Sequence, residues 1–185
     1  MNSKEKTINT AKILIVDDEE NNIVVLERLL RQAGYSDIHC TTDSRKTMAL
    51  YDQLSPDRVF LDLHMPEPNG FDLLEQLSSR RPEDGLYAPV LVLTADITPG
   101  AKLKALGLGA NDFLTKPIER CELLLRTRNL LKTRFLHRDL MNETVSLHEM
   151  NRRAIQAETS YRMILEQLLK SGEHPELESA CLKLE

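Results

Sequence analysis

Short apolar runs recur five times along the first two thirds of the chain. They occupy residues 13–16, 37–40, 59–62, 90–94 and 112–115. Four of these runs are almost continuous in Val, Ile, Leu or Phe, which is typical of strands buried on both faces of a parallel sheet. The run at 37–40 (DIHC) is less apolar, so we expect it nearer an edge of the sheet.

The segments between the runs have helical rather than strand spacing. Ile23, Leu26, Leu29 and Leu30 mark the apolar face of a first helix, and Gly34 is expected to stop it. Similar patterns predict three more helices: one between a cap at Asp43 or Ser44 and Pro56, one over Phe71–Leu77, and one from Pro99 to the glycines at 107 and 109. Strand and helix therefore alternate, which predicts an α/β domain with a five-stranded parallel sheet and helices on both faces.

The sequence after Pro117 has a different character. From Glu119 to about Lys170 it contains neither Pro nor Gly, and good helix formers dominate, so we expect one long helix or a helix with a single break. Gly172 and Pro175 are expected to end it. The predicted organisation is a flexible terminus at 1–10, a domain core at 11–118, a long helix or coiled-coil linker at 119–170 and a tail at 171–185.

Composition excludes several broad classes of protein. A chain of 185 residues suits one domain with an appendage, and 41% hydrophobic with 29% charged residues is typical of a soluble globular protein. The formal net charge of -5 argues against direct nucleic-acid binding. We expect a cytoplasmic protein without a membrane span, because no apolar stretch approaches the required length and the start is polar. Cys40, Cys121 and Cys181 are widely spaced, so reduced thiols are expected.

Polar side chains follow the predicted strands at one end. Asp17 and Asp18 come directly after the first strand, Asp62 ends the third, Thr94 ends the fourth, and Lys116 follows the fifth. In open α/β sheets this edge is the place where ligands bind. Each residue alone has an ordinary explanation, as a helix cap or a solvated charge, but their joint occurrence favours a site. Three carboxylates held together repel unless a cation joins them, and their hard oxygens suit Mg²⁺, which favours phosphate as a further ligand.

Four motifs in a fixed order carry a resemblance to a known family. They are ILIVDDEENN, FLDLHMPEPNGFDLL, VLVLTA and DFLTKP, and over roughly residues 11 to 130 the chain resembles the receiver domain of two-component response regulators. The resemblance implies a flavodoxin-like, doubly wound receiver fold. It also implies that Asp62 accepts a phosphoryl group from a sensor histidine kinase or a phosphotransfer protein, with Mg²⁺ as cofactor.

The same resemblance assigns metal ligands and a switch. Asp18 would bind Mg²⁺ directly and Asp17 largely through water, with Asp62 and the backbone carbonyl of His64 as the other protein ligands. The residues that would bind the phosphoryl group or respond to it are Thr94, Ala95, Lys116 and Phe113. Thr94 would donate its hydroxyl to the phosphoryl group, and Phe113 would turn inward behind it.

His64 and Asp96 depart from the commonest pattern of the family. They lie two residues after Asp62 and Thr94, so they are candidates for tuning the lifetime of the phosphorylated state. His64 either holds an attacking water or shields the phosphoryl group, and the sequence leaves both open.

The turn after Asp62 is expected to leave its carboxylate open to a partner. Met65-Pro66 and Asn69-Gly70 carry the chain sharply away from the strand end. Pro66 fixes its φ, and Gly70 is expected to permit a backbone conformation that is costly for other residues.

Two other functions remain as alternatives. A Mg²⁺-dependent phosphohydrolase with an aspartate nucleophile typically carries Asp-x-Asp after its first strand, whereas this chain has Asp17-Asp18-Glu19. An inert receiver-like scaffold is disfavoured by the complete set of residues at the sheet edge. We expect no enzyme activity beyond the phosphorylation chemistry of the receiver itself.

The long helix is expected to pair with a second copy as a parallel coiled coil. Leu140, Leu147, Ala154, Tyr161 and Leu168 recur every seven residues. The companion positions for the other core site are Leu130, His137, Thr144, Asn151, Glu158 and Leu165, which are mostly polar, with Asn151 as a candidate register setter. The alternative is a solitary helix folded back on its own domain or on an output domain. Residues 119–185 contain no helix-turn-helix signature, so a downstream output domain outside this chain is expected.

Overall fold

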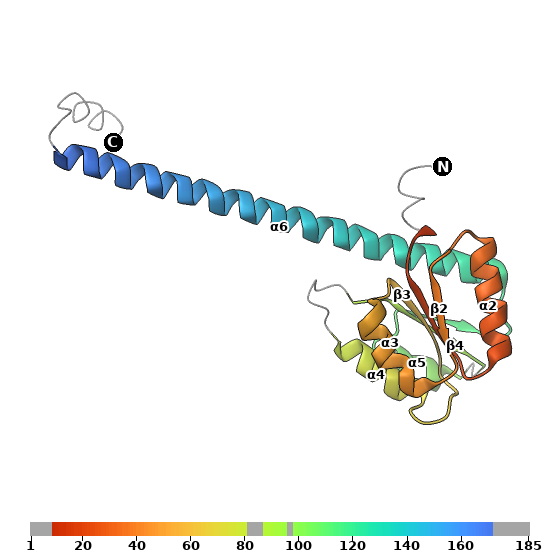
Figure 1. Ribbon diagram of the computed structural model, residues 1–185. Helices are drawn as coiled ribbons and strands as arrows, with labels where there is room; N and C mark the ends of the chain where they lie inside the picture. Colours follow the sequence, from red (N-terminus) through yellow and green to blue (C-terminus); the bar gives the residue numbers. More distant parts are fainter. Residues whose placement is uncertain (1–8, 81–86, 96–97, 172–185) are drawn as a thin grey trace. The chain divides into compact units, whose positions relative to one another are not determined.

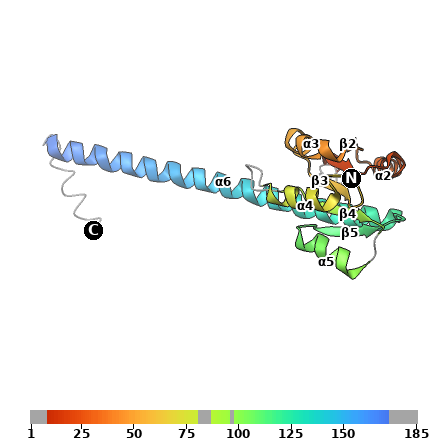
Figure 2. The same ribbon diagram turned by 90° about the horizontal axis from the view of Figure 1, so that it is seen from below.

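The computed structural model describes residues 9–80, 87–95 and 98–171 (Figures 1 and 2). The side chains of Leu165 and of residues 168–171 are not described. The expectations for the terminus before residue 9, for Asp96, for Cys181, for the helix stop at Gly172 and Pro175 and for the tail after 171 lie outside the described residues.

A five-stranded parallel sheet forms the centre of the first part of the chain. Its strands are β1 (Ile13–Val16), β2 (Ile38–Thr41), β3 (Arg58–Asp62), β4 (Val90–Thr94) and β5 (Asp112–Thr115). Their order across the sheet is β2-β1-β3-β4-β5, and every neighbouring pair is parallel. The weak run at 37–40 thus forms the edge strand, shifted by one residue. Figure 2 shows β5 beside α5 near the opposite edge.

Helices cover both faces of this sheet. The elements are α2 (Glu20–Gln32), a 3₁₀ turn η1 (Ser44–Lys46), α3 (Thr47–Leu54), α4 (Gly70–Ser79), α5 (Pro99–Gly107) and α6 (Arg120–Ser171). Figure 1 shows α3, α4 and α5 on one side of the sheet and α2 on the other. The predicted flavodoxin-like, doubly wound fold followed by a long helix is therefore confirmed.

Alternate strand residues build two separate cores. Side chains such as Val59 and Leu61 pack with residues of α3, α4 and α5, whereas Phe60 between them packs on the other face with α2 and α6. Because both faces are covered, almost every residue of β1, β3 and β4 is fully buried. This burial explains the continuous apolar runs in the sequence.

The helix ends follow the capping chemistry of the sequence. Asp43 caps η1 by accepting a hydrogen bond from the Arg45 amide at 3.1 Å. Asn69 opens α4 with a capping box: its side chain accepts from the amides of Phe71 and Asp72, and the Asp72 carboxylate accepts from the Asn69 amide. Gly34, just after α2, has a φ of +96°, which explains a glycine at that stop.

Gly70 is required for a different reason from the one predicted. The positive-φ glycines among the described residues are Gly34 and Gly109, so Gly70 has no unusual backbone conformation. Its Cα instead lies against the end of β3: a Cβ there would sit 2.1 Å from the Asp62 carbonyl oxygen and 2.5 Å from the Leu63 Cα. Close approach of two backbone segments, rather than φ, therefore explains the glycine.

The first part of α6 is fixed to the amino-terminal ends of the strands. Arg134 is largely buried; its Nε lies 3.2 Å from the Asp57 carboxylate, and its Nη1 donates to the Tyr87 carbonyl at 2.8 Å. Arg126 pairs with Asp112 at the start of β5 at 2.6 Å. These contacts hold α6 where its apolar residues complete the core that it shares with α2.

The chain divides into two compact units, residues 1–138 and 139–185. α6 runs through the boundary, and every described side chain from Asp139 to Ile164 is exposed. None of the helices in the described ranges combines the length and the apolar character needed to cross a membrane.

Candidate functional site

The carboxylates of Asp17, Asp18 and Asp62 gather at the carboxyl ends of β1 and β3. One oxygen from each lies within 4.8 Å of the others. Asp17 and Asp62 are buried, and Asp18 is the more accessible of the three. The two strands end side by side because β1 and β3 are direct neighbours in the sheet, with Val16 opposite Leu61. The sequence prediction of an acidic site at this edge is therefore realised in the arrangement of its carboxylates.

Asp17 is oriented by the start of α2. Its Oδ1 accepts hydrogen bonds from the Glu19 amide at 3.0 Å and from the Asn22 side-chain amide at 2.9 Å. Both bonds leave Oδ2 directed at the other polar groups of the site. Sequence reasoning missed Asn22, and the signal that could have found it is its place one helical turn after the acidic pair.

Lys116 joins two of the carboxylates. Its Nζ lies 2.9 Å from Asp17 Oδ2 and 3.1 Å from Asp62 Oδ1, and its side chain is 19% exposed. Burial lowers the pKa of the Lys116 ammonium, but the hydrogen bond to Asp17 and the charges of Asp62 and Asp17 more than offset this, so the pKa is raised. The ammonium therefore stays charged and partly neutralises the cluster.

The Asp62 carboxylate is only incompletely satisfied by this lysine. Its buried Oδ1 is near Lys116 but has no aligned hydrogen bond among the described residues, so the contact is an ion pair rather than a good hydrogen bond. Burial raises the pKa of Asp62, and the charges of Asp17 and Asp18 add to this effect, while Lys116 opposes it. An unsatisfied carboxylate oxygen in an acidic cluster is a position that a cation or an incoming electrophile would fill.

The residues present fit Mg²⁺. They offer hard carboxylate oxygens from three side chains, close enough to share one ion, and one of them is a buried oxygen that lacks a partner. The ammonium of Lys116 would remain beside such an ion, in reach of a bound anion. The backbone carbonyl of His64 as a further ligand remains a prediction.

Thr94 lies on β4 and Phe113 on β5, the strands that continue the sheet beyond β3, and Ala95 comes just after β4. Thr94 ends β4, is 2% exposed and pairs in register with Thr115, while Ala95 follows it at the surface. The backbone amide of Lys116 donates to the Thr94 carbonyl at 2.8 Å, which ties the two strand ends together.

The Phe113 side chain is half-buried against the core formed with α3, α4 and α5. The ammonium of Lys102 from α5 lies 4.4 Å from the centroid of the Phe113 ring, a cation–π contact that the sequence did not predict. The proposed switch movement of Thr94 and Phe113 remains a prediction.

Of the two residues predicted to tune the lifetime of the phosphorylated state, the structure describes His64. His64 is exposed and lies two residues beyond Asp62. Asp96 lies outside the described residues.

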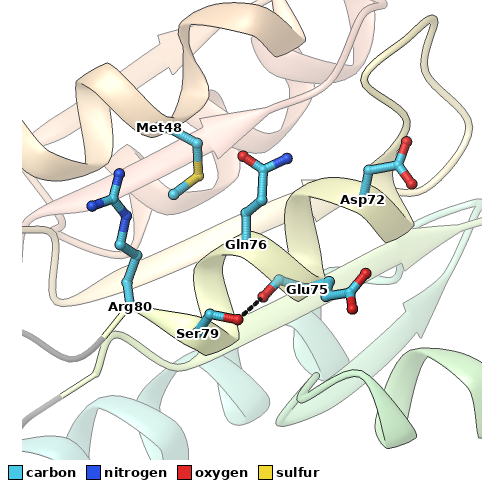
Figure 3. Close-up of a pocket in the computed structure, with 6 residues that line it drawn as sticks. All are labelled: Met48, Asp72, Glu75, Gln76, Ser79 and Arg80. Carbon is cyan, nitrogen blue, oxygen red and sulfur yellow. Dashed lines mark hydrogen bonds between the residues drawn. The ribbon is translucent and has the colours of Figure 1, made fainter.

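A hollow of about 400 Å³ lies between α3 and α4, away from the acidic site (Figure 3). Neither Lys116 nor any of the three clustered carboxylates lines it. Ser79 donates to the Glu75 carbonyl at 2.8 Å, and Arg80 forms an ion pair with Asp52 at 3.0 Å. The Ser79 hydroxyl and the Arg80 guanidinium are therefore already engaged. The residues that line the hollow are Met48, Asp72, Glu75, Gln76, Ser79 and Arg80.

Comparison with known proteins covers the same part of the chain. A family model, the response regulator receiver domain, matches residues 13–128. Among solved structures, chemotaxis response regulator CheY4 of Vibrio cholerae is 27% identical with a TM-score of 0.58, covering 65% of this chain and 98% of that one. NtrX from Brucella abortus is 27% identical with a TM-score of 0.64, covering 72% of this chain and 29% of that one.

Curated relatives are longer than the matched region. The sensory/regulatory protein RpfC of Xanthomonas campestris is 38% identical over 117 residues, which are 63% of this chain and 16% of RpfC. The DNA-binding dual master transcriptional regulator RpaA of Synechocystis is 40% identical over 121 residues, 65% of this chain and 49% of RpaA. With the acidic cluster, Lys116 and the five-stranded parallel sheet in place, the match shows that this chain belongs to the family of response regulator receiver domains.

Proposed function

We propose that Asp62 accepts a phosphoryl group from the phosphohistidine of a sensor histidine kinase or phosphotransfer protein, in a reaction that requires Mg²⁺. The observation that carries this proposal is the buried Asp62 oxygen without an aligned partner, placed among Asp17, Asp18 and Lys116 at the open edge of the sheet. Membership of the receiver family supports it.

The step is a simple phosphoryl transfer. A carboxylate oxygen of Asp62 forms a bond to phosphorus, the phosphorus–nitrogen bond of the donor histidine breaks, and the released imidazole takes a proton from solvent. The product is an acyl phosphate on Asp62. Because the carboxylate must be ionised to attack, the positive charge of Lys116 supports the reaction by opposing the effect of burial on the pKa of Asp62.

The side chains around Asp62 would hold the phosphoryl group in place. Mg²⁺, when bound, would neutralise charge on the phosphoryl oxygens. Asp17 and Asp18 would hold that ion, with Asp17 kept in orientation by Asn22. Lys116 is already within 3.1 Å of Asp62, so a small movement of its ammonium would pair it with a phosphoryl oxygen.

The proposed response to phosphorylation begins at Thr94. Its hydroxyl would turn to donate to the phosphoryl group, and the half-buried Phe113 ring would move into the space that Thr94 leaves. Phe113 would then loosen its contact with Lys102 of α5, which couples the site to the surface of α5. A comparison of side-chain chemical shifts with and without a beryllofluoride mimic tests this step, and unchanged Thr94 and Phe113 signals would contradict it.

The change would be transmitted through α6 to a second copy of the chain or to an output domain. α6 begins five residues after Thr115, the last residue of β5, and it is fixed to β3 and β5 through Arg134 and Arg126. The relatives RpaA and RpfC extend well beyond the matched region, which supports an output outside this chain. Homodimerisation through α6 is part of this proposal.

The direct test is the intact mass of the full chain after treatment with a small-molecule phosphodonor. One phosphoryl group is expected with Mg²⁺ and none after chelation of divalent cations. Asp62→Asn and Asp18→Ala should prevent the gain in mass, while Glu75→Gln, which removes an exposed carboxylate on α4, should leave it unchanged. Undiminished labelling of Asp62→Asn would exclude Asp62 as the acceptor.

The same experiment separates the receiver from a phosphohydrolase. A receiver takes up one phosphoryl group per chain and then loses it at its own rate, whereas a phosphohydrolase releases phosphate from added esters continuously. Sustained turnover of a simple phosphate ester that depends on Asp62 would favour the phosphohydrolase.

A further inference from the structure

The second unit of the chain presents apolar side chains to solvent along α6. All described side chains from Asp139 to Ile164 are exposed, including several large apolar ones. A lone helix with no buried face gains little from packing, so an apolar stripe along it calls for a partner. The question is which of these residues form a continuous stripe.

One set of residues keeps the spacing of a coiled-coil seam without a gap. Leu140, Leu147, Ala154 and Tyr161 recur every seven residues, as the sequence indicated. The positions three residues after each of them are occupied by Glu143, Met150, Ala157 and Ile164. Together these eight residues alternate in steps of three and four, which is the repeat of the two core positions of a coiled coil. We call them the α6 stripe.

The predicted companion positions give an equally regular heptad. Thr144, Asn151 and Glu158 lie four residues after the first set, so with them the first set would occupy the other core position. The two registers differ in polarity: Thr144, Asn151 and Glu158 are polar, whereas Met150, Ala157 and Ile164 are apolar. In the more apolar register Asn151 flanks the stripe. Leu168 would continue the stripe, but its side chain is outside the described residues. The seam is accordingly much more apolar than the sequence prediction held, with Glu143 as its one charged member within residues 140–164.

We propose that the α6 stripe is the surface on which a second copy of this chain binds, in parallel and in register, with Glu143 as an acidic break in the paired core. This inference rests on the proposed homodimer and names the face, the orientation and the weak point of that dimer.

Charge complementarity supports pairing between identical chains. Arg153 and Glu158 flank the stripe on opposite sides, five residues apart. In a parallel, in-register pair, a residue that flanks the core on one helix lies opposite the residue five positions further on along the other helix. Arg153 of each copy would therefore face Glu158 of the other, which gives two ion pairs in the dimer. The other flanking residues between 144 and 160 are Thr144, Ser146, Asn151 and Ser160, all uncharged, so no repulsion between flanking residues opposes this register.

Glu143 acts against the pairing at one layer. In a parallel pair its carboxylate would face the same carboxylate of the second copy, and two like charges moved out of water repel each other. The nearest layers on either side, Leu140 and Leu147, are apolar. The pair would therefore be held mainly by the layers from Leu147 to Ile164, and opening would be easiest at the end that leads to the first unit.

The stripe can be tested with matched substitutions of equal chemistry. Ile164 and Ile155 are similarly exposed, 53% and 56%, but only Ile164 belongs to the stripe; Met150 and Met163 form a second such pair, each 59% exposed. In sedimentation of the full chain over a range of concentrations, Ile164→Asp and Met150→Asp should dissociate the dimer, raising its dissociation constant by about a hundredfold or more. Ile155→Asp and Met163→Asp should leave it unchanged.

Separate substitutions test the parallel orientation of the two helices and the acidic break at Glu143. Arg153→Glu should weaken the dimer, and the double exchange Arg153→Glu with Glu158→Arg should restore it, since the parallel pair is re-formed with reversed signs. Glu143→Leu should tighten the dimer about tenfold or more by replacing a repelling layer with an apolar one. A weaker dimer in Glu143→Leu, or no rescue in the double variant, would overturn the break or the parallel register.

The outcomes separate this inference from the proposed dimer. A wild-type chain that stays monomeric at high concentration, phosphorylated or not, refutes the homodimer itself. A dimer that survives Ile164→Asp and Met150→Asp refutes the stripe but leaves a dimer formed elsewhere. Dissociation by Ile155→Asp and Met163→Asp alone would place the interface on another face of α6.

Discussion

Substitution of Gly70 by alanine tests how the phosphorylation site is built. The structure leaves no room for the added methyl group: it would lie 2.1 Å from the Asp62 carbonyl oxygen and 2.5 Å from the Leu63 Cα. Both atoms belong to the backbone, so no side chain can rotate away to relieve the contact. Either the start of α4 or the end of β3 has to move.

The expected cost follows from two opposing effects. Forcing extra atoms into a well-packed site typically costs about 1–3 kcal/mol, and a clash with backbone belongs at the upper end of that range. Alanine is favoured over glycine within a helix by about 1 kcal/mol, which offsets part of the cost. A net loss of roughly 2 kcal/mol in the free energy of unfolding is therefore expected.

Gly100→Ala is the matched control. Gly100 lies in the first turn of α5, and a Cβ there would meet nothing within 4 Å. The same substitution should then leave the free energy of unfolding unchanged or raise it by up to about 1 kcal/mol. Urea unfolding followed by tyrosine fluorescence reports the first unit, because the chain has no tryptophan and Tyr35 and Tyr51 are buried there.

Gly70→Ala should also impair phosphorylation. A shift of the Asp62 backbone would move its carboxylate away from Asp17 and Lys116, so labelling by a small-molecule donor should slow under conditions in which the variant is still folded. A Gly70→Ala chain as stable as Gly100→Ala, with unchanged labelling, would refute the close-approach explanation.

Four further substitutions probe charges in the first unit. Asp62→Asn should raise the melting temperature at neutral pH and lose that advantage in acid: burial raises the pKa of Asp62, so its contribution to stability is present at low pH and lost as pH rises through the raised pKa. Arg134→Met should lower the free energy of unfolding by about 3 kcal/mol, because it leaves the largely buried Asp57 carboxylate short of its partner. Arg138 makes a longer and more exposed ion pair with the same carboxylate, so Arg138→Met should lower that free energy by less than about 1 kcal/mol. Arg58→Met should increase the free energy of unfolding by about 1–3 kcal/mol in urea titrations, and a decrease would contradict its description as an uncompensated buried charge.

The sheet and the position of the acidic site were predictable from the sequence. Strands buried on both faces have to be apolar throughout, so β1, β3 and β4 stood out, and the polar residues that followed them necessarily met at one edge. The edge strand β2 was misplaced by one residue because it is only partly buried, and its pattern is correspondingly weak.

Contacts between distant segments were not predictable in the same way. The requirement for glycine at position 70 depends on the distance between α4 and the end of β3, which no local pattern encodes. The ammonium of Lys102 over Phe113 joins two elements that the sequence separates by ten residues and a turn. On α6, the sequence prediction paired one set of seven-residue repeats with polar companions, whereas the proposed stripe pairs it with the more apolar set that includes Met150 and Ile164.

β3 carries a charged side chain with incomplete hydrogen bonding at each end, and the two cases have different explanations. Asp62 at the carboxyl end belongs to the acidic cluster, so the proposed Mg²⁺ and phosphoryl group would account for its missing partner. Arg58 at the amino end is fully buried, and all three guanidinium nitrogens lack hydrogen-bond partners among the described residues. Its guanidinium carbon lies 4.9 Å from the centroid of the Phe60 ring.

Burial lowers the pKa of Arg58 to about 9, partly opposed by the charges of Tyr35 and Asp112, which still leaves it protonated at neutral pH. A permanent cation without hydrogen bonds destabilises the fold unless something else requires it, and no ligand can reach a side chain that is 0% exposed. The same deficit in hydrogen bonding thus indicates a binding position at one end of the strand and a cost in stability at the other. Their neighbours distinguish the two: Asp62, although itself buried, shares its cluster with the more accessible Asp18 and with Lys116, whereas Arg58 is fully buried at the other end of the strand.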